Sequence, residues 1–254
     1  MNDRQSTRAA DLLRVLEERT ADALGRRLLG LYLTGSLVTG DFDERVSDID
    51  LVAVLPDEPR AEDLARLGVM HDRIAREHPE WDDRVEVIYI GADALATFRT
   101  RASTIGAISP GEPFHTKAAG IDWLINWYLI QRYGRVLRGP PFAEFAPAIG
   151  DEEFVDSARS LAHLMRPGLD ETTTTRSRAY YLITLCRALV TVTTGRMPSK
   201  AYALAWTRER VPDWVGLLDR CAAIWRGDMD GPVEKVLPLP EAQRCADEIL
   251  ARLR

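Results

Sequence analysis

The chain has few cysteines, no long apolar run and no excess of basic residues, and each absence argues against a class of protein. Its 254 residues include three cysteines without a C-x-x-C pair, so neither a disulfide framework nor a cysteine-based zinc site is expected. The longest apolar segment, residues 121–130, is interrupted by Asn126, whereas a membrane-spanning helix needs about 20 apolar residues. The N-terminus shows no apolar signal region. We therefore expect a cytoplasmic protein without a membrane partner.

Charge is distributed unevenly along the chain, whose formal net charge is −6. Residues 151–254 contain 15 acidic and 15 basic side chains, which leaves 24 of the 39 acidic and 18 of the 33 basic residues in the first 150. A protein whose main substrate is DNA or RNA normally carries a basic face. We therefore expect no nucleic-acid partner, and the acidic excess favours a cationic or metal-bound ligand in the N-terminal part. The sequence indicates no oligomeric state.

The first 90 residues combine helical and strand patterns. Apolar residues at helical spacing predict a helix before Gly30 and another over residues 60–78. Short apolar runs bounded by turn residues predict strands over residues 31–34, 49–55 and 85–90. This order predicts an α/β (α+β) domain with a mixed sheet.

Strand patterns disappear from residue 117 onward. Helical periodicity is found over residues 118–133, 153–165, 178–194, 200–210, 213–225 and 241–253. Glycine and proline interrupt the chain at residues 139–141 and 147–151, which marks the best domain boundary. We therefore expect an N-terminal domain over residues 1–150 and an all-α helical-bundle domain over residues 151–254.

Three carboxylates carry the clearest chemical signal, and two of them lie in the stretch LYLTGSLVTGDFDERVSDIDLVAVL, residues 31–55. Asp48 and Asp50 are two residues apart at the start of a predicted strand, so they project from the same face. Glu86 lies in the third predicted strand, on the face opposite its apolar neighbours, and it joins the pair if the two strands are adjacent. Because Mg²⁺ typically takes one or two protein carboxylates plus phosphate and water, the three residues predict a metal site for a bound nucleotide. The alternative for Asp48 is a turn residue at a strand entry.

Gly35 and Ser36 end the first predicted strand and suit a phosphate group. Glycine permits close approach of the backbone, and the hydroxyl and amides that follow can bind phosphate oxygens. No G-K-[ST] follows, so this is not a P-loop. Gly-Ser and Asp-x-Asp each occur by chance, but their ordered combination with a third acidic strand is specific.

Two segments resemble known families. TGSLVTGDFDERVSDIDLVAVL resembles the signature of the nucleotidyltransferase superfamily that includes DNA polymerase β. LITLCRALVTVTTGRMPSKAYALAWTRERVP is similar to the C-terminal domain of the aminoglycoside 3''-adenylyltransferases, which modify streptomycin and spectinomycin. The resemblance runs from about residue 25 to residue 230 and implies an antibiotic-resistance enzyme that transfers AMP from ATP to a hydroxyl of a small acceptor, with release of pyrophosphate.

The resemblance also implies roles for individual residues. Asp48 and Asp50 would hold two Mg²⁺ ions, with Glu86 as a third carboxylate of the metal site and as the general base. Ser36 and Ser47 match nucleotide-contacting positions. Arg187 and Lys200 match basic positions that meet the triphosphate. The alternatives are an internal salt bridge for Arg187 and a solvated, capped helix start for Lys200.

The acceptor is less well defined, because an aminoglycoside is a polycation and its site must supply carboxylates. Before the helix at residue 178 the chain has Thr172-Thr173-Thr174-Thr175-Arg176-Ser177-Arg178, with Asp170 and Glu171 upstream. Either the two arginines disfavour a cationic acceptor, or they face solvent and Asp170 or Glu171 turns inward. Two rival functions stay open: an adenylyltransferase acting on another small molecule, a protein hydroxyl or an RNA end, and a non-catalytic nucleotide-binding descendant.

Overall fold

The computed structural model describes residues 3–253, which form two compact units that meet between Ile149 and Gly150. The division lies one residue from the predicted boundary. The first unit contains all the strands of the described chain, and the second is helical. This is the predicted fold class, a mixed-sheet domain followed by an all-α domain.

The first unit is built on a six-stranded sheet with the order β5-β4-β3-β2-β1-β6. Its strands are β1 Gly30–Thr34, β2 Ile49–Leu55, β3 Val85–Gly91, β4 Ser103–Ser109, β5 Glu112–Ala119 and β6 Arg135–Arg138. Neighbours β2 and β3 run parallel, and the other pairs are antiparallel, which confirms the mixed sheet. The parallel pair requires a crossover, and α3 Ala61–Glu77 provides it.

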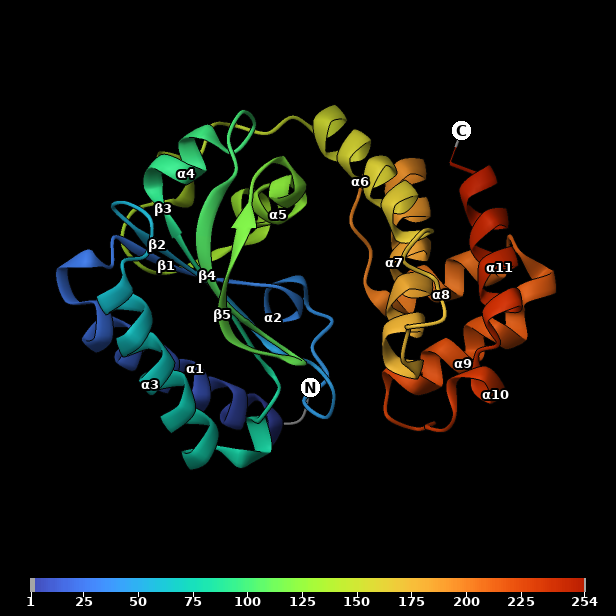
Figure 1. Ribbon diagram of the computed structural model, residues 1–254, viewed down its shortest axis with the longest axis horizontal. Helices are drawn as coiled ribbons and strands as arrows, with labels where there is room; N and C mark the ends of the chain where they lie inside the picture. Colours follow the sequence, from blue (N-terminus) through green and yellow to red (C-terminus); the bar gives the residue numbers. More distant parts are fainter. Residues whose placement is uncertain (1–2, 254) are drawn as a thin grey trace. The chain divides into compact units, whose positions relative to one another are not determined.

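Helices α1 Asp3–Leu24 and α3 lie side by side against one face of this sheet (Figure 1). Their apolar stripes meet alternate strand residues such as Leu33, Leu51 and Val87 in one core. Because side chains alternate across a strand, Asp50 and Glu86 project from the opposite face. Remaining helices of the unit are α2 Ser36–Thr39, α4 Ala92–Thr97 and α5 Leu124–Tyr133, with 3-10 turns η1 Gly25–Arg27, η2 Pro79–Trp81, η3 Ile121–Trp123 and η4 Phe142–Glu144.

The expectation that strand structure ends before residue 117 is wrong for two strands. β5 continues to Ala119, and β6 follows the helix that was predicted over residues 118–133 and that begins only at Leu124. Both are edge strands whose side chains are largely exposed. Edge strands carry polar and charged residues that limit aggregation, so the apolar alternation that signals a strand is weak in them.

The second unit packs around α7 Thr175–Thr194, half of whose residues are buried. Its neighbours in space are α6 Asp151–Met165, α8 Lys200–Arg208, α9 Val215–Trp225 and α11 Leu239–Ala251. Shorter elements are η5 Pro212–Trp214 and α10 Val233–Val236. All three cysteines lie buried in this core, where loss of hydration raises the pKa of the Cys186 thiol to about 12. They act as small apolar residues.

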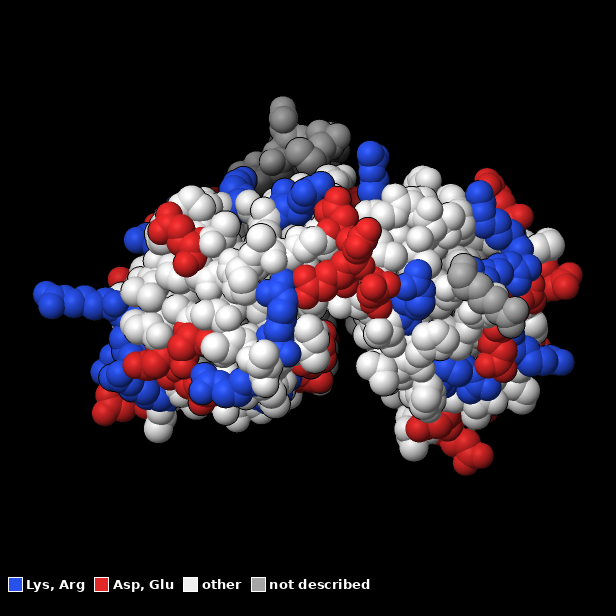
Figure 2. All heavy atoms as spheres, turned by 90° about the horizontal axis from the view of Figure 1, so that it is seen from above, with Lys and Arg blue, Asp and Glu red and all other residues white. Residues whose placement is uncertain are grey.

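Surface charge is mixed on each unit. Both acidic and basic side chains are spread over the face that Figure 2 shows, among the residues drawn in colour. Within residues 3–253, no helix has both the length and the apolar character needed to cross a membrane.

Candidate metal-phosphate site

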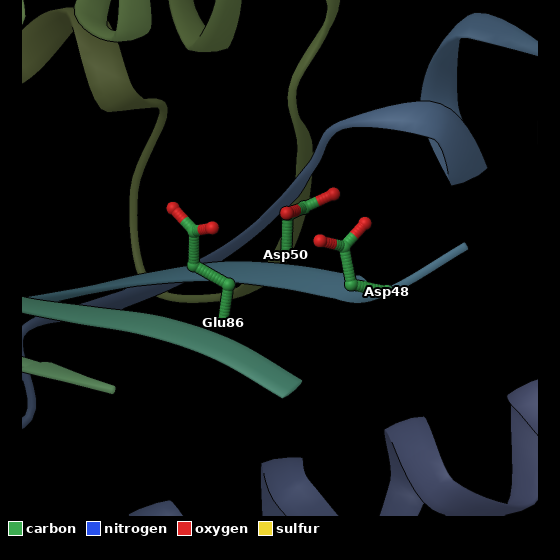
Figure 3. A group of neighbouring side chains, drawn as sticks. All are labelled: Asp48, Asp50 and Glu86. Carbon is green, nitrogen blue, oxygen red and sulfur yellow. The ribbon is translucent and has the colours of Figure 1, made fainter. Parts of the chain in front are cut away.

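Asp48, Asp50 and Glu86 form a cluster at the ends of two adjacent strands. Each is half-buried, and one carboxylate oxygen from each lies within 4.8 Å of the others (Figure 3). The parallel register of β2 and β3 places Asp50 directly opposite Glu86, and Asp48 is one residue before β2. The carboxylates are thus gathered by backbone pairing, and the set of hard oxygen donors suits a divalent cation.

Gly35 is required by the close packing of this cluster. Its φ of 68° lies in the region that favours glycine, and a Cβ atom built there would lie 1.7 Å from Asp50 Oδ2. The turn after β1 therefore passes against the carboxylate of Asp50 with no space for a side chain. This contact brings the Gly35-Ser36 backbone to the carboxylate cluster.

Ser36 has a buried hydroxyl oxygen that lacks a hydrogen-bond partner among the described residues. Buried polar atoms are nearly always paired, so an unpaired hydroxyl beside a carboxylate cluster fits a bound polar ligand such as a phosphate. Ser47 differs: it is buried, and its Oγ accepts a hydrogen bond from the Asp43 amide at 3.0 Å. Within the structure Ser47 closes the loop that leads to Asp48.

Arg187 lies within α7 and Lys200 begins α8, both in the second unit. Arg187 is half-buried, not fully buried, and its Nε donates to the carbonyl of Pro198 at 3.1 Å. Lys200 is the first residue of α8, and the preceding Ser199 accepts a hydrogen bond from the Tyr202 amide. The Lys200 ammonium lies 3.3 Å from the centroid of the Trp225 ring. The capped helix start that was considered for Lys200 is present.

The position of Arg178 differs from both alternatives considered for the threonine-rich segment, residues 172–178. It neither faces solvent nor offers a free charge, because it is completely buried and its guanidinium contacts Glu234 at 2.6 Å. The same group also donates to Thr173 Oγ1 and to the carbonyls of Leu237 and Asp170. Arg178 is therefore a structural residue that ties the segment before α7 to the segment around α10.

The threonine run leads into α7, which begins at Thr175. Thr174 is the N-cap, and it exchanges hydrogen bonds with Ser177 in a capping box. The Asp170 carboxylate accepts from the amide and hydroxyl of Thr172, which lowers the pKa of Asp170. Asp170 is thus held ionised at the edge of this segment.

Arg84 is a residue of the site that sequence reasoning missed. It lies two residues before Glu86, and its guanidinium donates to the carbonyls of Ser47 and Glu44. Its position between a predicted turn and a predicted strand was its only signal in the sequence. The carbonyl acceptors lie about 40 residues away in the chain and carry no sequence signal.

Comparisons with known proteins agree with the geometry. A nucleotidyltransferase domain family matches residues 14–97, and the family described as aminoglycoside adenylyltransferase, C-terminal domain, matches residues 145–252. No curated protein matches the sequence. Among solved structures, a spectinomycin adenyltransferase AAD(9) from Enterococcus faecialis, determined with ATP and spectinomycin, has the same fold. Its TM-score is 0.74 at 15% sequence identity, with 96% of this chain and 98% of that chain covered.

The nucleotidyltransferase match lies in the first unit and the C-terminal-domain match covers nearly all of the second, whereas residues 98–144 are covered by neither. The first match contains the turn after β1 and all three carboxylates, and the second contains α7 and α8. The chain therefore belongs to the aminoglycoside adenylyltransferase family within the nucleotidyltransferase superfamily, and it is a transferase.

Proposed function

We propose that the protein transfers AMP from Mg-ATP to a hydroxyl of an aminoglycoside-class acceptor, with streptomycin and spectinomycin as the leading candidates. The observation that carries this proposal is the cluster of Asp48, Asp50 and Glu86 beside the unpaired hydroxyl of Ser36. The structural relative that was determined with ATP and spectinomycin supports it through the shared fold. At 15% identity, that likeness leaves the acceptor of this chain to experiment.

The donor side of the reaction uses residues of the first unit. Asp48 and Asp50 would hold Mg²⁺, with Glu86 as the third carboxylate in reach. Bound divalent cations would polarise the α-phosphate and stabilise negative charge on the attacking and leaving oxygens. The Ser36 hydroxyl would donate to a phosphate oxygen. Ser47 would contribute to the nucleotide site through the loop that its hydroxyl closes.

Glu86 is the proposed general base. Its carboxylate projects from β3 on the same side as the two aspartates, so an acceptor hydroxyl that approaches the α-phosphate can meet it (Figure 3). The hydroxyl proton passes to Glu86 as the acceptor oxygen bonds to the α-phosphorus. The bond from that phosphorus to the bridging oxygen breaks, pyrophosphate leaves with the electron pair, and AMP stays on the acceptor.

Arg187 and Lys200 are proposed to bind the triphosphate from the second unit. A guanidinium and an ammonium near the α7–α8 connection give two fixed cationic donors, and both types of side chain bind phosphate oxygens.

A polycationic acceptor fits this segment, because the positive charge of Arg178 is neutralised within the protein. Its guanidinium is buried against Glu234 and three further oxygen acceptors, so it is not available to repel a cationic ligand. Asp170 and Glu171 precede it with exposed side chains. These two carboxylates are the proposed source of negative charge for the acceptor in this segment.

Incubation with Mg-ATP and a panel of aminoglycosides, followed by mass spectrometry, tests the proposal. We expect an AMP adduct on at least one aminoglycoside, formed at least about 100-fold more slowly when Glu86→Gln replaces the wild type. Release of pyrophosphate should match the adduct in amount. If the wild type binds Mg-ATP but modifies no member of the panel, the aminoglycoside assignment is wrong. If it does not bind Mg-ATP at all, the adenylyltransferase assignment is wrong.

A further inference from the structure

Asp48 lies just outside the sheet, so strand pairing holds the backbone only on its C-terminal side. It directly precedes β2, whose registered pairs with β3 begin at Ile49. The Ile49 amide donates to the carbonyl of Arg84 at 3.0 Å, which holds the backbone on the C-terminal side of Asp48. On the N-terminal side, the carbonyl of Ser47 accepts from Arg84 Nε at 3.1 Å. One residue, Arg84, therefore holds the chain on both sides of Asp48.

The Arg84 side chain is itself held in place. Its guanidinium carbon lies 4.5 Å from the centroid of the Trp81 ring, which is buried. Trp81 stacks in turn on Phe42, at the start of the loop that leads to Asp48, with 6.5 Å between ring centroids. A planar guanidinium on an aromatic face is restricted in orientation, so its donors point at fixed acceptors.

These donors fix the end of a loop that is already closed on itself. The Asp43 carbonyl accepts from the amides of Val46 and Ser47, and the Asp43 amide donates to Ser47 Oγ. Arg84 binds this closed loop from outside, at the carbonyl of Ser47 and at the carbonyl of Glu44, the latter at 2.5 Å. Without these bonds, the loop could turn as a unit and move the Asp48 carboxylate relative to Asp50.

We propose that Arg84 is a positioning residue that holds Asp48 in the geometry needed to bind a divalent cation with Asp50. This inference rests on the proposed function, because it assigns Asp48 to a metal site. Residues that orient metal ligands through hydrogen bonds commonly change metal affinity by about 10- to 100-fold. Arg84 acts here on the backbone next to Asp48, through its hydrogen bonds to the carbonyls of Ser47 and Glu44.

The charge of Arg84 and its hydrogen bonds have opposite expected effects on metal affinity, so variants can distinguish the two contributions. A guanidinium close to Asp48 repels a cation, so loss of the charge alone would tighten metal binding. Loss of the hydrogen bonds alone would weaken it. Arg84→Lys keeps the charge but not the planar fork, and Arg84→Met removes both. If positioning is the main role, both variants bind the metal more weakly.

The readout is the gain in ATP affinity on adding Mg²⁺, measured by calorimetry without an acceptor. For each protein, ATP is titrated once with EDTA and once with excess Mg²⁺, and the ratio of the two dissociation constants gives the gain. We expect Arg84→Lys and Arg84→Met to reduce the gain about tenfold, with ATP affinity in EDTA within about threefold of the wild type. Arg73→Met is the matched control, because exposed Arg73 pairs with Glu77 on α3, and it should keep the full gain.

The outcomes of these titrations either support or overturn the positioning role of Arg84. A gain that is unchanged in Arg84→Lys, or larger in Arg84→Met, overturns the positioning role. Asp48→Asn separates this result from the proposed function: if Asp48→Asn keeps the full gain, or if the wild type shows no gain, the metal site is wrong and the positioning role fails with it. Should Arg84→Met not fold in a thermal scan, Arg84→Lys alone carries the test.

Discussion

Gly35→Ala tests whether the close contact between the turn after β1 and Asp50 is needed for activity. The added Cβ atom would lie 1.7 Å from Asp50 Oδ2 and 2.5 Å from its Cγ. Non-bonded atoms do not approach a Cβ atom this closely, so either the Asp50 carboxylate rotates away or the turn moves. Both movements separate Asp50 from the position in which its oxygen lies near those of Asp48 and Glu86.

Gly35→Ala should have two effects: backbone strain lowers stability, and displacement of Asp50 lowers turnover. The backbone at Gly35, with φ 68° and ψ −153°, lies in a region that only glycine adopts easily, and another residue there costs about 1–3 kcal/mol. For a unit of this size, that cost lowers the melting temperature by about 2–4 °C per kcal/mol. We expect the variant to stay folded at room temperature, because typical proteins have unfolding free energies of about 5–15 kcal/mol. Displacement of a metal ligand by about 1 Å reduces turnover about 100-fold.

Gly40→Ala is the matched control for the backbone contribution. Gly40 also has a positive φ, 84°, but a Cβ atom there would meet nothing within 4 Å. We expect Gly40→Ala to lose about 1 kcal/mol of unfolding free energy and to keep turnover within about threefold of the wild type. Gly35→Ala should lose about 100-fold in AMP transfer to the acceptor found by mass spectrometry. Equal turnover of the two variants would refute the argument that the Gly35–Asp50 contact positions a ligand.

Three further predictions concern a base, a buried charge and a buried histidine. Glu86→Gln should lower turnover by about 10²- to 10⁴-fold with Mg-ATP affinity unchanged by calorimetry, and normal turnover would exclude Glu86 as the base. Arg178→Met should cost about 3 kcal/mol in urea unfolding because it leaves buried carbonyls unpaired, whereas exposed Arg176→Met should cost under about 0.5 kcal/mol; equal costs would contradict the structural role. Burial lowers the pKa of His71 to about 4, so the unfolded chain binds the extra proton and stability should fall from about pH 6.5 to pH 4, by up to about 3 kcal/mol. His71→Gln should remove that part of the pH dependence, and an unchanged profile would exclude His71 as its source.

The sheet that carries the site was predictable because its central strands are apolar and short. β2 has the predicted bounds, and β3 extends one residue beyond them. In both strands a single acidic residue interrupts an otherwise buried run, so the sequence alone placed Asp50 on the same face as Asp48 and Glu86 on the face opposite its apolar neighbours. Adjacency of the two strands could only be assumed, since two strands joined through a helix need not be neighbours. The register supplies that adjacency.

Hydrogen-bond acceptors on the backbone were the part that the sequence could not supply. Every residue has a carbonyl group, so the identities of residues 44 and 47 do not mark them as partners of Arg84. The same holds for the unpaired hydroxyl of Ser36, which differs from other serine hydroxyls only through its surroundings in the folded chain.

Arg178 shows why the charge of a segment does not by itself predict which ligand the segment accepts. In the sequence, two arginines near the expected acceptor site argue against a cationic ligand, because the nearest carboxylates are upstream. In the structure, the carboxylate that compensates Arg178 is Glu234, 56 residues later in the chain, and three oxygen acceptors complete the shell. A buried guanidinium with this many partners contributes little to the electrostatic potential at the protein surface. The electrostatics of the acceptor segment therefore depend on its exposed residues, Asp170, Glu171 and Arg176, of which two are acidic.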